Sequence, residues 1–221
     1  MIPPISPTAL QTFVLCPRQY QAKYITKEVK FEPSKHAEFG DLLHKSIEMY
    51  LKKGTPLPAL LAPLQPALDK IRSKPVFLHG AEVKLAVDKE GRNCDWFDKA
   101  AYQRCIVDAI VSDVEGKHIV CIDWKTGKHR PAPIQHDIIK RCVSASFRQA
   151  FSVTTLFIYL FSGSADRQRH TPGDALPALD RHMNDLQAAY AAKKFDPTPN
   201  GLCKNWCDVV ACPHNGKYKG T

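Results

Sequence analysis

The chain lacks the hydrophobic segments that would place it in or across a membrane. It has no run of about 18 apolar residues, the length that indicates a transmembrane helix. The longest apolar stretch, residues 153–161, contains two threonines and suits a buried strand. The opening MIPPISPTAL has no basic region followed by an apolar block, so it does not resemble a secretory signal. We therefore expect a cytoplasmic protein with no membrane partner.

Internal repeats and low-complexity tracts are also missing, and acidic residues are outnumbered by basic ones. The chain has 221 residues, 44% hydrophobic and 24% charged, which is the composition of an ordinary folded protein. Thirty-one Lys and Arg against 22 Asp and Glu leave a formal net charge of +9. A surplus of that size favours polyanionic partners, with nucleic acid before an anionic membrane.

Cysteine is plentiful, and its use differs along the chain. Eight cysteines in a reducing compartment argue against a disulfide framework, so we expect core residues, metal ligands or cluster ligands. Cys105 and Cys121 lie in apolar strands and suit the core. Four thiolates are the usual ligands of a [4Fe–4S] cluster or of structural Zn²⁺, while free thiols in an exposed tail are the alternative. The candidate set is one upstream cysteine and three near the C-terminus: Cys16, Cys203, Cys207 and Cys212.

Hydrophobic periodicity predicts helices first and a mixed sheet afterwards. The expected helices are residues 6–24, with a kink or junction at Pro17, and residues 36–52, 56–73, 131–149 and 176–194. The expected strands are residues 82–87, 102–111, 118–124 and 153–161, with a turn and loop at residues 88–96. Because the first three strands are consecutive, we expect an antiparallel meander. The order of elements favours an α/β (α+β, mixed-sheet) fold with one core.

Three polar side chains stand out within this apolar meander. Side chains alternate along a strand, so Asp123 and Lys125 share one face and Trp124 points to the other. Asp108 lies within an apolar run, where a lone carboxylate is costly unless it is paired or binds a metal. Strand pairing across the turn at residues 114–117 would bring Asp108 close to Asp123. Two close carboxylates repel each other, and a divalent cation is the common remedy.

This arrangement has a catalytic and a structural interpretation. Carboxylate oxygens suit Mg²⁺ or Mn²⁺, and such an ion activates water and stabilises charge on a phosphoryl oxygen. Lys125 would then orient the water or stabilise the phosphate. The alternative is a buried Asp–Lys ion pair beside a hairpin aspartate, and these residues alone leave both interpretations open.

A family resemblance favours the catalytic interpretation. Asp108 with the run Asp123-Trp124-Lys125-Thr126-Gly127-Lys128 resembles the P-D-(D/E)-x-K nuclease pattern, in the D-x-K-T-G form of the RecB-like nucleases. Further matches occur in the right order along nearly the whole chain. They are the S-x-S-x-L and C-P-x-x-Y motifs at Ser6–Leu10 and Cys16–Tyr20, the G-x-x-x-H motif at Gly40–His44, the first-strand acid at Glu82, and the Q-x-x-x-Y motif at Gln135, where Ile139 replaces the tyrosine.

The resemblance implies a role for each matching residue. His44, Asp108, Asp123 and the backbone carbonyl of Trp124 would bind Mg²⁺ or Mn²⁺. Lys125 would assist the attacking water, Gln135 would position the lysine or the DNA, and Glu82 would touch or support the site. The four cysteines resemble the [4Fe–4S] ligands of AddB and of CRISPR-associated members, with Zn²⁺ as the alternative. The spacing departs from the family, with C-x3-C-x4-C in place of C-x2-C-x5-C.

Basic residues flank the expected site on the strand-to-helix side. Lys128, Arg130, Lys140 and Arg141 would contact DNA phosphates without reading sequence. On the first helix, Arg18 and Tyr20 would guide single-stranded DNA by charge and stacking.

Together these features predict a single restriction-endonuclease-like domain over residues 1–221. Its parts would be a helical segment (1–75), a nuclease core (76–195) and a cysteine clasp (196–221). The resemblance implies a Mg²⁺- or Mn²⁺-dependent deoxyribonuclease, an exonuclease on single strands or DNA ends, 5′ to 3′, with endonuclease activity also open. It would serve recombination, repair or CRISPR adaptation in a bacterial, archaeal or phage-infected cell, as a homo-oligomer or with a protein of those pathways. The alternative is a non-catalytic DNA-binding or scaffold subunit, against which the intact catalytic motif argues.

Overall fold

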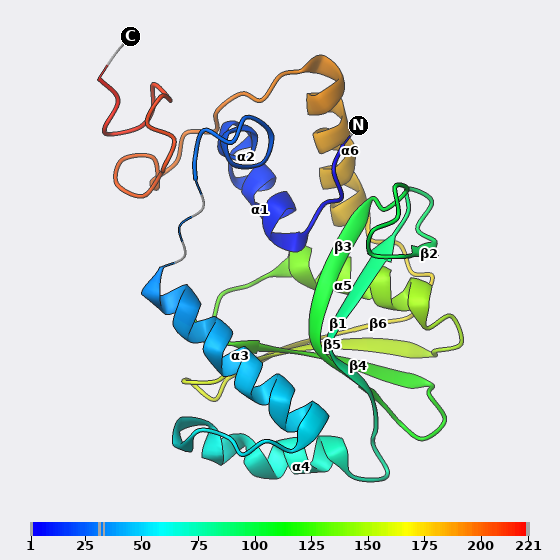
Figure 1. Ribbon diagram of the computed structural model, residues 1–221. Helices are drawn as coiled ribbons and strands as arrows, with labels where there is room; N and C mark the ends of the chain where they lie inside the picture. The colour runs from blue at the N-terminus through cyan, green and yellow to red at the C-terminus, as the bar shows by residue number, and fades with distance from the viewer. Residues whose placement is uncertain (1, 31, 33, 220–221) are drawn as a thin grey trace. The chain divides into compact units, whose positions relative to one another are not determined.

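The computed structural model describes residues 2–30, 32 and 34–219 (Figure 1). Its contacts divide the chain into two compact units, one formed by residues 1–32 with 176–221 and the other by residues 33–175. The sequence-based assignment of one domain with boundaries near residues 75 and 195 stays a prediction.

The larger unit is a mixed sheet with helices on both faces. Its strands follow the order β2-β1-β3-β4-β5-β6, and every neighbouring pair is antiparallel except β4 and β5. α5 connects that parallel pair, as a crossover requires. The α/β class expected from the sequence is therefore confirmed. The elements are α3 (Lys35–Lys53), the 3₁₀ helix η2 (Ala59–Leu64), α4 (Gln65–Arg72), β1 (Phe77–Val87), β2 (Asn93–Cys94), β3 (Gln103–Ser112), β4 (His118–Lys125), α5 (Pro133–Ser146), β5 (Ser152–Tyr159) and β6 (Ala165–His170).

The predicted meander is present as β1, β3 and β4, with differences at its margins. β1 begins at Phe77 rather than at residue 82, because a left-handed residue at Glu82 interrupts the alternation that marks a strand. The short β2 lies within the segment expected to be a loop. β6 was not predicted, because its sequence ADRQRH is polar and pairs only along one edge, with β5.

The helices differ from their predicted bounds mainly where proline occurs. The helix expected at residues 56–73 is a 3₁₀ turn containing Pro63 followed by α4. α5 begins at Pro133, within the expected opening at residues 131–133, and ends at Ser146 rather than near residue 149. Proline favours the first turn of a helix because it lacks the N–H that the turn leaves unpaired.

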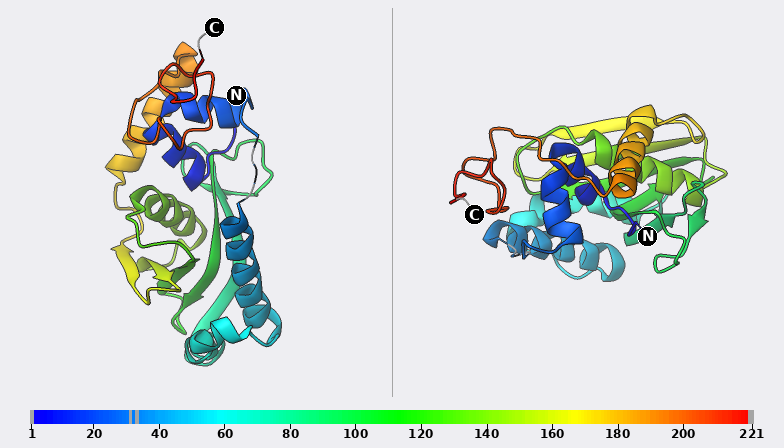
Figure 2. Two further views of the ribbon diagram at one scale, coloured as in Figure 1. Left: turned by 90° about the vertical axis from the view of Figure 1, so that its left-hand side faces the viewer. Right: turned by 90° about the horizontal axis from the view of Figure 1, so that it is seen from above.

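In the larger unit, α3 lies over one face of this sheet and α5 over the other (Figures 1 and 2), and core residues lie on both faces. On one face, Leu43 and Ile47 of α3 pack in a cluster that includes Ile122 and Trp124 of β4. On the other face, the fully buried Ile138 of α5 belongs to the helix that contacts β1, β3 and β5. β4 itself is buried on both faces from Cys121 to Trp124, so its polar residues need partners.

The smaller unit contains α1 (Pro7–Leu15), α2 (Pro17–Tyr20), the π-helix η1 (Gln21–Ile25) and α6 (Pro177–Ala192). Ser6 caps α1 by accepting a hydrogen bond from Ala9 N, and Pro17 begins α2, so the predicted junction is confirmed. Tyr20 lies in an aromatic cluster with Phe13, Tyr190 and Phe195, and its hydroxyl is 3.1 Å from that of Tyr190. The tail from residue 196 to 219 contains turns without helix or strand.

Candidate active site

Three acidic or imidazole side chains from separate elements converge in the larger unit. His44 extends from α3, Glu82 from β1 and Asp108 from β3, and one potential ligand atom of each lies within 4.8 Å of the others. No other group of three His, Cys, Asp or Glu residues meets this distance in the part of the chain that the structure describes. His44 Nδ1 lies 3.1 Å from Asp108 Oδ2. This cluster is the candidate metal centre.

Glu82 reaches the cluster through an unusual backbone conformation. Its φ is +54°, although it lies inside β1 between Ala81 and Val83, which pair with Ala109 and Val107. A non-glycine residue in this region costs about 1–3 kcal/mol, and such residues concentrate at functional sites. The strain therefore favours a direct role of Glu82 at the cluster over a supporting one.

A second group of side chains lies at the end of β4, on the face opposite the Trp124 ring. Lys125 Nζ lies 2.7 Å from Asp123 Oδ2, so the shared face that strand alternation predicted is confirmed. Gln135, in the first turn of α5, bridges the pair. It accepts a hydrogen bond from Lys125 Nζ at 2.8 Å and donates one to Asp123 Oδ1 at 2.7 Å. The amide thus fixes the positions of both charged groups.

Asp108 and Trp124 connect the two groups across adjacent strands. Asp108 Oδ2 accepts a hydrogen bond of 2.7 Å from the backbone N–H of Trp124, beside the paired residues Ala109 and Ile122. The Trp124 side chain is buried against the α3 face of the sheet. The predicted proximity of the Asp108 and Asp123 strands is therefore present, and the tryptophan ring serves the core. The role of the Trp124 carbonyl as a metal ligand stays a prediction.

Gly40 explains how the α3 histidine approaches the strands. A Cβ added at Gly40 would lie 3.0 Å from Thr126 Oγ1, which is tighter than ordinary contact. The missing side chain lets α3 pack closely against the segment that follows β4. His44 lies about one turn further along the same helix face, so the G-x-x-x-H spacing brings its ring to Asp108.

The electrostatics of the site disfavour three ionised carboxylates. Burial and the charge of Asp108 raise the pKa of Asp123 from 3.8 to about 6, although Lys125 and His44 act in the opposite direction. Burial, with the charges of Asp108 and Glu48, raises the pKa of Glu82. Burial alone would lower the pKa of His44, but its hydrogen bond with Asp108 and the nearby carboxylates raise it overall. A bound cation would relieve this repulsion.

A further observation supports a metal ligand at Asp123. Asp123 Oδ2 is enclosed and lies 2.7 Å from the Lys125 ammonium, with no other hydrogen-bond donor among the described residues. A carboxylate oxygen has a further lone pair that can bind a metal ion. Oxygen ligands of this kind fit Mg²⁺ or Mn²⁺, so the donor set agrees with a hard divalent ion.

Phe157 of β5 is a site residue that the sequence did not reveal. The Lys125 ammonium lies 4.8 Å from the centre of its ring, at a distance where cation–π attraction operates. The buried His136 is stacked on the same ring with the centroids 3.8 Å apart, and its ring nitrogens are hydrogen bonded to Thr155 and Asp166. In the sequence Phe157 looks like any other apolar strand residue, so no local signal distinguished it.

The four candidate cluster cysteines all lie in the smaller unit. Cys16 Sγ accepts a hydrogen bond of 3.4 Å from the backbone N–H of Thr198, and Cys203 Sγ accepts one of 3.3 Å from that of Asn200. Cys207 and Cys212 pack beside Ala22 and Val209. Zinc bound by thiolates at about 2.3 Å spaces their sulfur atoms by roughly 3.8 Å. Within the described residues no three of these sulfurs lie within 4.8 Å of one another, so the thiols are not arranged as a closed zinc site.

The predicted DNA contacts differ in their surroundings. Lys128 and Arg130 are exposed in the segment between β4 and α5, as phosphate contacts require. Arg141 is half-buried and donates to Gln103, while Arg18 forms an ion pair of 2.6 Å with Glu28. These residues stay predictions.

Two of the predicted DNA contacts need correction. Tyr20 is 0% exposed within its aromatic cluster, so its ring has no free face on which a base could stack. Lys140 is also buried, and its ammonium donates to Gln168 and Asp137 inside the larger unit. Both residues lie on helices, and the sequence alone did not show that their polar side chains point to the buried side of the helix.

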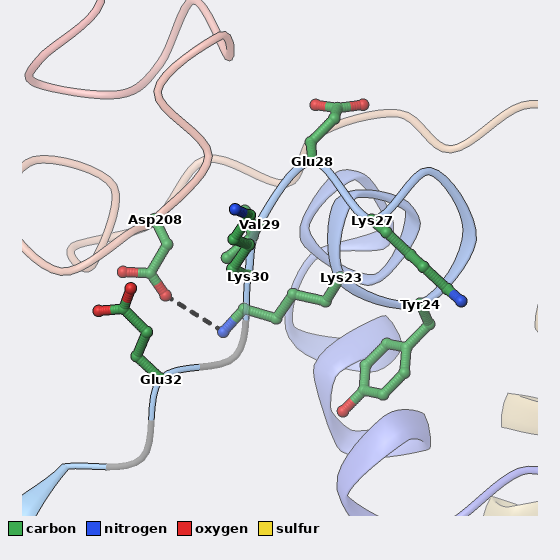
Figure 3. A pocket seen from close by; sticks show the side chains of 8 residues that line it. All are labelled: Lys23, Tyr24, Lys27, Glu28, Val29, Lys30, Glu32 and Asp208. Atoms are coloured by element: carbon green, nitrogen blue, oxygen red, sulfur yellow. Dashed lines mark ion pairs between the residues drawn. The ribbon is translucent and has the colours of Figure 1, made fainter.

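A cavity of about 1140 Å³ lies in the smaller unit, between η1, the segment after it and the tail (Figure 3). Lys23 forms an ion pair of 3.3 Å with Asp208 across it. Its walls carry three lysines and three acids, so their charges balance. They include none of the predicted catalytic or cysteine residues. The lining residues are Lys23, Tyr24, Lys27, Glu28, Val29, Lys30, Glu32 and Asp208.

The mixed sheet, the convergent carboxylates and the adjacent Asp-x-Lys pair together form the arrangement that the sequence led us to expect of a metal-dependent nuclease site. The model of the PD-(D/E)XK nuclease superfamily matches residues 4–213, and the chain belongs to that superfamily. No curated protein matches the chain. Among the described residues, no helix is both long and apolar enough to cross a membrane.

Two solved structures are similar to the chain. One is the crystal structure of SSO0001, at 17% identity and a TM-score of 0.46, covering 96% of this chain and 87% of that one. The other is a candidate exonuclease from Eubacterium rectale, at 11% identity and a TM-score of 0.49, covering 92% and 86%.

Proposed function

We propose that this nuclease is a RecB-like deoxyribonuclease that uses Mg²⁺ or Mn²⁺ held by His44, Glu82, Asp108 and Asp123. The observation that carries the proposal is the convergence of three of these side chains within 4.8 Å, beside the Asp123–Lys125 pair. A bound divalent ion would activate water and stabilise charge on the phosphate. The Trp124 carbonyl is proposed as a further ligand.

In this proposal Lys125 is the catalytic cation. An ammonium has three donors, and Lys125 directs one at Gln135 while it pairs with Asp123. Its side chain is 26% exposed, so a remaining donor can reach a water or a phosphoryl oxygen. Gln135 and Phe157 act as positioning residues, because they hold the ammonium without needing to touch DNA.

The proposed substrate is DNA, as single strands or ends, cleaved exonucleolytically from 5′ to 3′, with endonuclease action as a further activity. The formal charge of +9 and the exposed Lys128 and Arg130 support a phosphate-rich ligand. The resemblance supports recombination, repair or CRISPR adaptation, as a homo-oligomer or with a protein partner. These finer assignments rest on the motifs.

We further propose that Cys16, Cys203, Cys207 and Cys212 bind a [4Fe–4S] cluster, with Zn²⁺ as the alternative. All four belong to one compact unit, and backbone N–H groups already donate to two of the sulfurs, as is common around clusters. In a [4Fe–4S] cluster each cysteine thiolate binds a different iron atom. The four cysteine sulfurs therefore lie further apart than they would around one zinc ion. Anaerobic purification should yield an absorption shoulder at about 400 nm. Stoichiometric zinc without that shoulder would reject the cluster.

The rival proposal is a DNA-binding or scaffold subunit without catalysis. The test is cleavage of labelled single- and double-stranded DNA in Mn²⁺ by the wild type and by Asp123→Ala. Metal-dependent cleavage by the wild type alone supports the nuclease. Equal cleavage by both proteins, or by neither, rejects this active site, and binding without cleavage would favour the scaffold.

A further inference from the structure

Two large apolar rings are stacked on the surface of the larger unit. Phe39 and Phe161 have ring centroids 6.3 Å apart and ring planes 15° apart, yet they are 43% and 55% exposed. A stacked pair that leaves this much ring surface in water does not serve the core. We call Phe39 and Phe161 the aromatic pair.

The aromatic pair borders the end of β4 that carries the catalytic lysine. Lys125 pairs with Tyr159 of β5, and Leu160 N donates to Lys125 O at 2.9 Å, so Phe161 follows directly. Phe39 precedes Gly40, which packs against Thr126, the residue after Lys125. Both rings are therefore attached to residues in contact with the Lys125–Thr126 segment.

Exposed basic residues follow the same end of β4 in the chain. Lys128, His129 and Arg130 are exposed, and Tyr159 fixes their segment. The Tyr159 hydroxyl donates to Arg130 O at 2.8 Å, and the His129 ring lies 4.7 Å from the Tyr159 ring. The end of the β4–β5 pair thus carries cations for phosphates beside apolar rings for bases.

We propose that the aromatic pair is a stacking platform for an unpaired base of the DNA strand that enters the active site. This inference rests on the proposed nuclease function and adds the surface that selects single-stranded DNA. Every base has a flat apolar face, so aromatic side chains bind unpaired bases with little sequence preference. In a duplex those faces are already covered by neighbouring bases, so the platform favours single strands or frayed ends.

The test measures how much the bases add to DNA binding. Equilibrium binding is measured in EDTA, where metal-dependent cleavage is absent, with oligo(dT), an abasic oligonucleotide of the same length, and a blunt duplex. The wild type should bind oligo(dT) at least about 10-fold more tightly than the abasic strand. The Phe39→Ala/Phe161→Ala variant should lose most of that difference, and Phe161→Trp should keep it.

Phe151→Ala is the matched control. Phe151 is 62% exposed and precedes β5, whereas Phe161 lies beyond the opposite end of that strand. The control should retain the preference for bases. An unchanged preference in the double variant, or an equal loss in Phe151→Ala, would overturn the platform. The platform also fails if the aromatic pair instead joins two copies of the chain, in which case the double variant changes the sedimentation mass but not the base preference.

Cleavage in Mn²⁺ separates this inference from the proposed function. If the wild type cleaves DNA and the double variant has the same KM for single strands, the platform fails and the nuclease stands. If the wild type cleaves nothing but shows a base preference that requires the aromatic pair, the nuclease fails and the platform stands. Circular dichroism and thermal unfolding confirm that each variant is folded.

Discussion

Replacing Asp123 by asparagine should make the metal-free protein more stable at alkaline pH while abolishing cleavage. The side chain is 5% exposed, and its Oδ2 lies 2.7 Å from the Lys125 ammonium, which only partly offsets the effect of burial. Its pKa in the fold is about 6, against 3.8 for an ordinary aspartate. One pKa unit corresponds to 1.36 kcal/mol, so the ionised carboxylate costs the fold about 3 kcal/mol at most.

The sign of the pH dependence follows from the direction of this shift. Because the pKa of Asp123 is higher in the folded than in the unfolded state, the folded protein holds the proton more tightly. The penalty is therefore absent below about pH 4, grows between about pH 4 and 6, and is complete above about pH 7. Asparagine has a similar shape and no charge, so it removes the penalty but also the attraction to Lys125.

We accordingly expect Asp123→Asn to raise the free energy of unfolding by about 1–3 kcal/mol at pH 8 and by nearly nothing at pH 4. The assay is urea unfolding in EDTA at both pH values, followed by circular dichroism. Mn²⁺ should then raise the stability of the wild type at pH 8, but much less that of the variant. A variant that is less stable than the wild type at pH 8 in EDTA would refute this account of the site.

Three further changes and one control variant test other parts of the larger unit. Gln135→Leu removes both bridging hydrogen bonds at similar volume and should lower cleavage by about 10- to 100-fold with little loss of DNA binding; an unchanged rate would contradict its positioning role. Gly40→Leu would place a Cβ 3.0 Å from Thr126 Oγ1 and should lower the free energy of unfolding by about 1–3 kcal/mol, measured by thermal or urea denaturation. Equal stability would show that α3 can move away from Thr126 without cost. Lys128→Ala should weaken DNA binding and lower the slope of log Kd against log salt concentration by about one. Lys140→Ala is the control and should leave that slope unchanged, because the Lys140 ammonium is hydrogen bonded inside the fold.

Local periodicity in the sequence was enough to predict the frame of the site. Alternation along residues 118–125 puts Asp123 and Lys125 on one face and Trp124 on the other, because successive strand residues point in opposite directions. The Pro17 junction and the β1-β3-β4 meander follow from equally local rules. The ordered motifs added His44 and Gln135, whose partners lie far away in the chain.

Tertiary packing decided which polar groups meet and which are withdrawn from water. Glu82 meets His44 and Asp108 because β1 pairs with β3 and α3 packs against both strands, and these contacts join residues far apart in the sequence. Phe157 holds Lys125 through a ring that its sequence context does not distinguish. Tyr20 and Lys140 were expected on the DNA-binding surface, but the contacts that bury them come from residues distant in sequence. Periodicity specifies the direction of a side chain from its own element, whereas burial and pairing depend on the neighbours that folding brings to it.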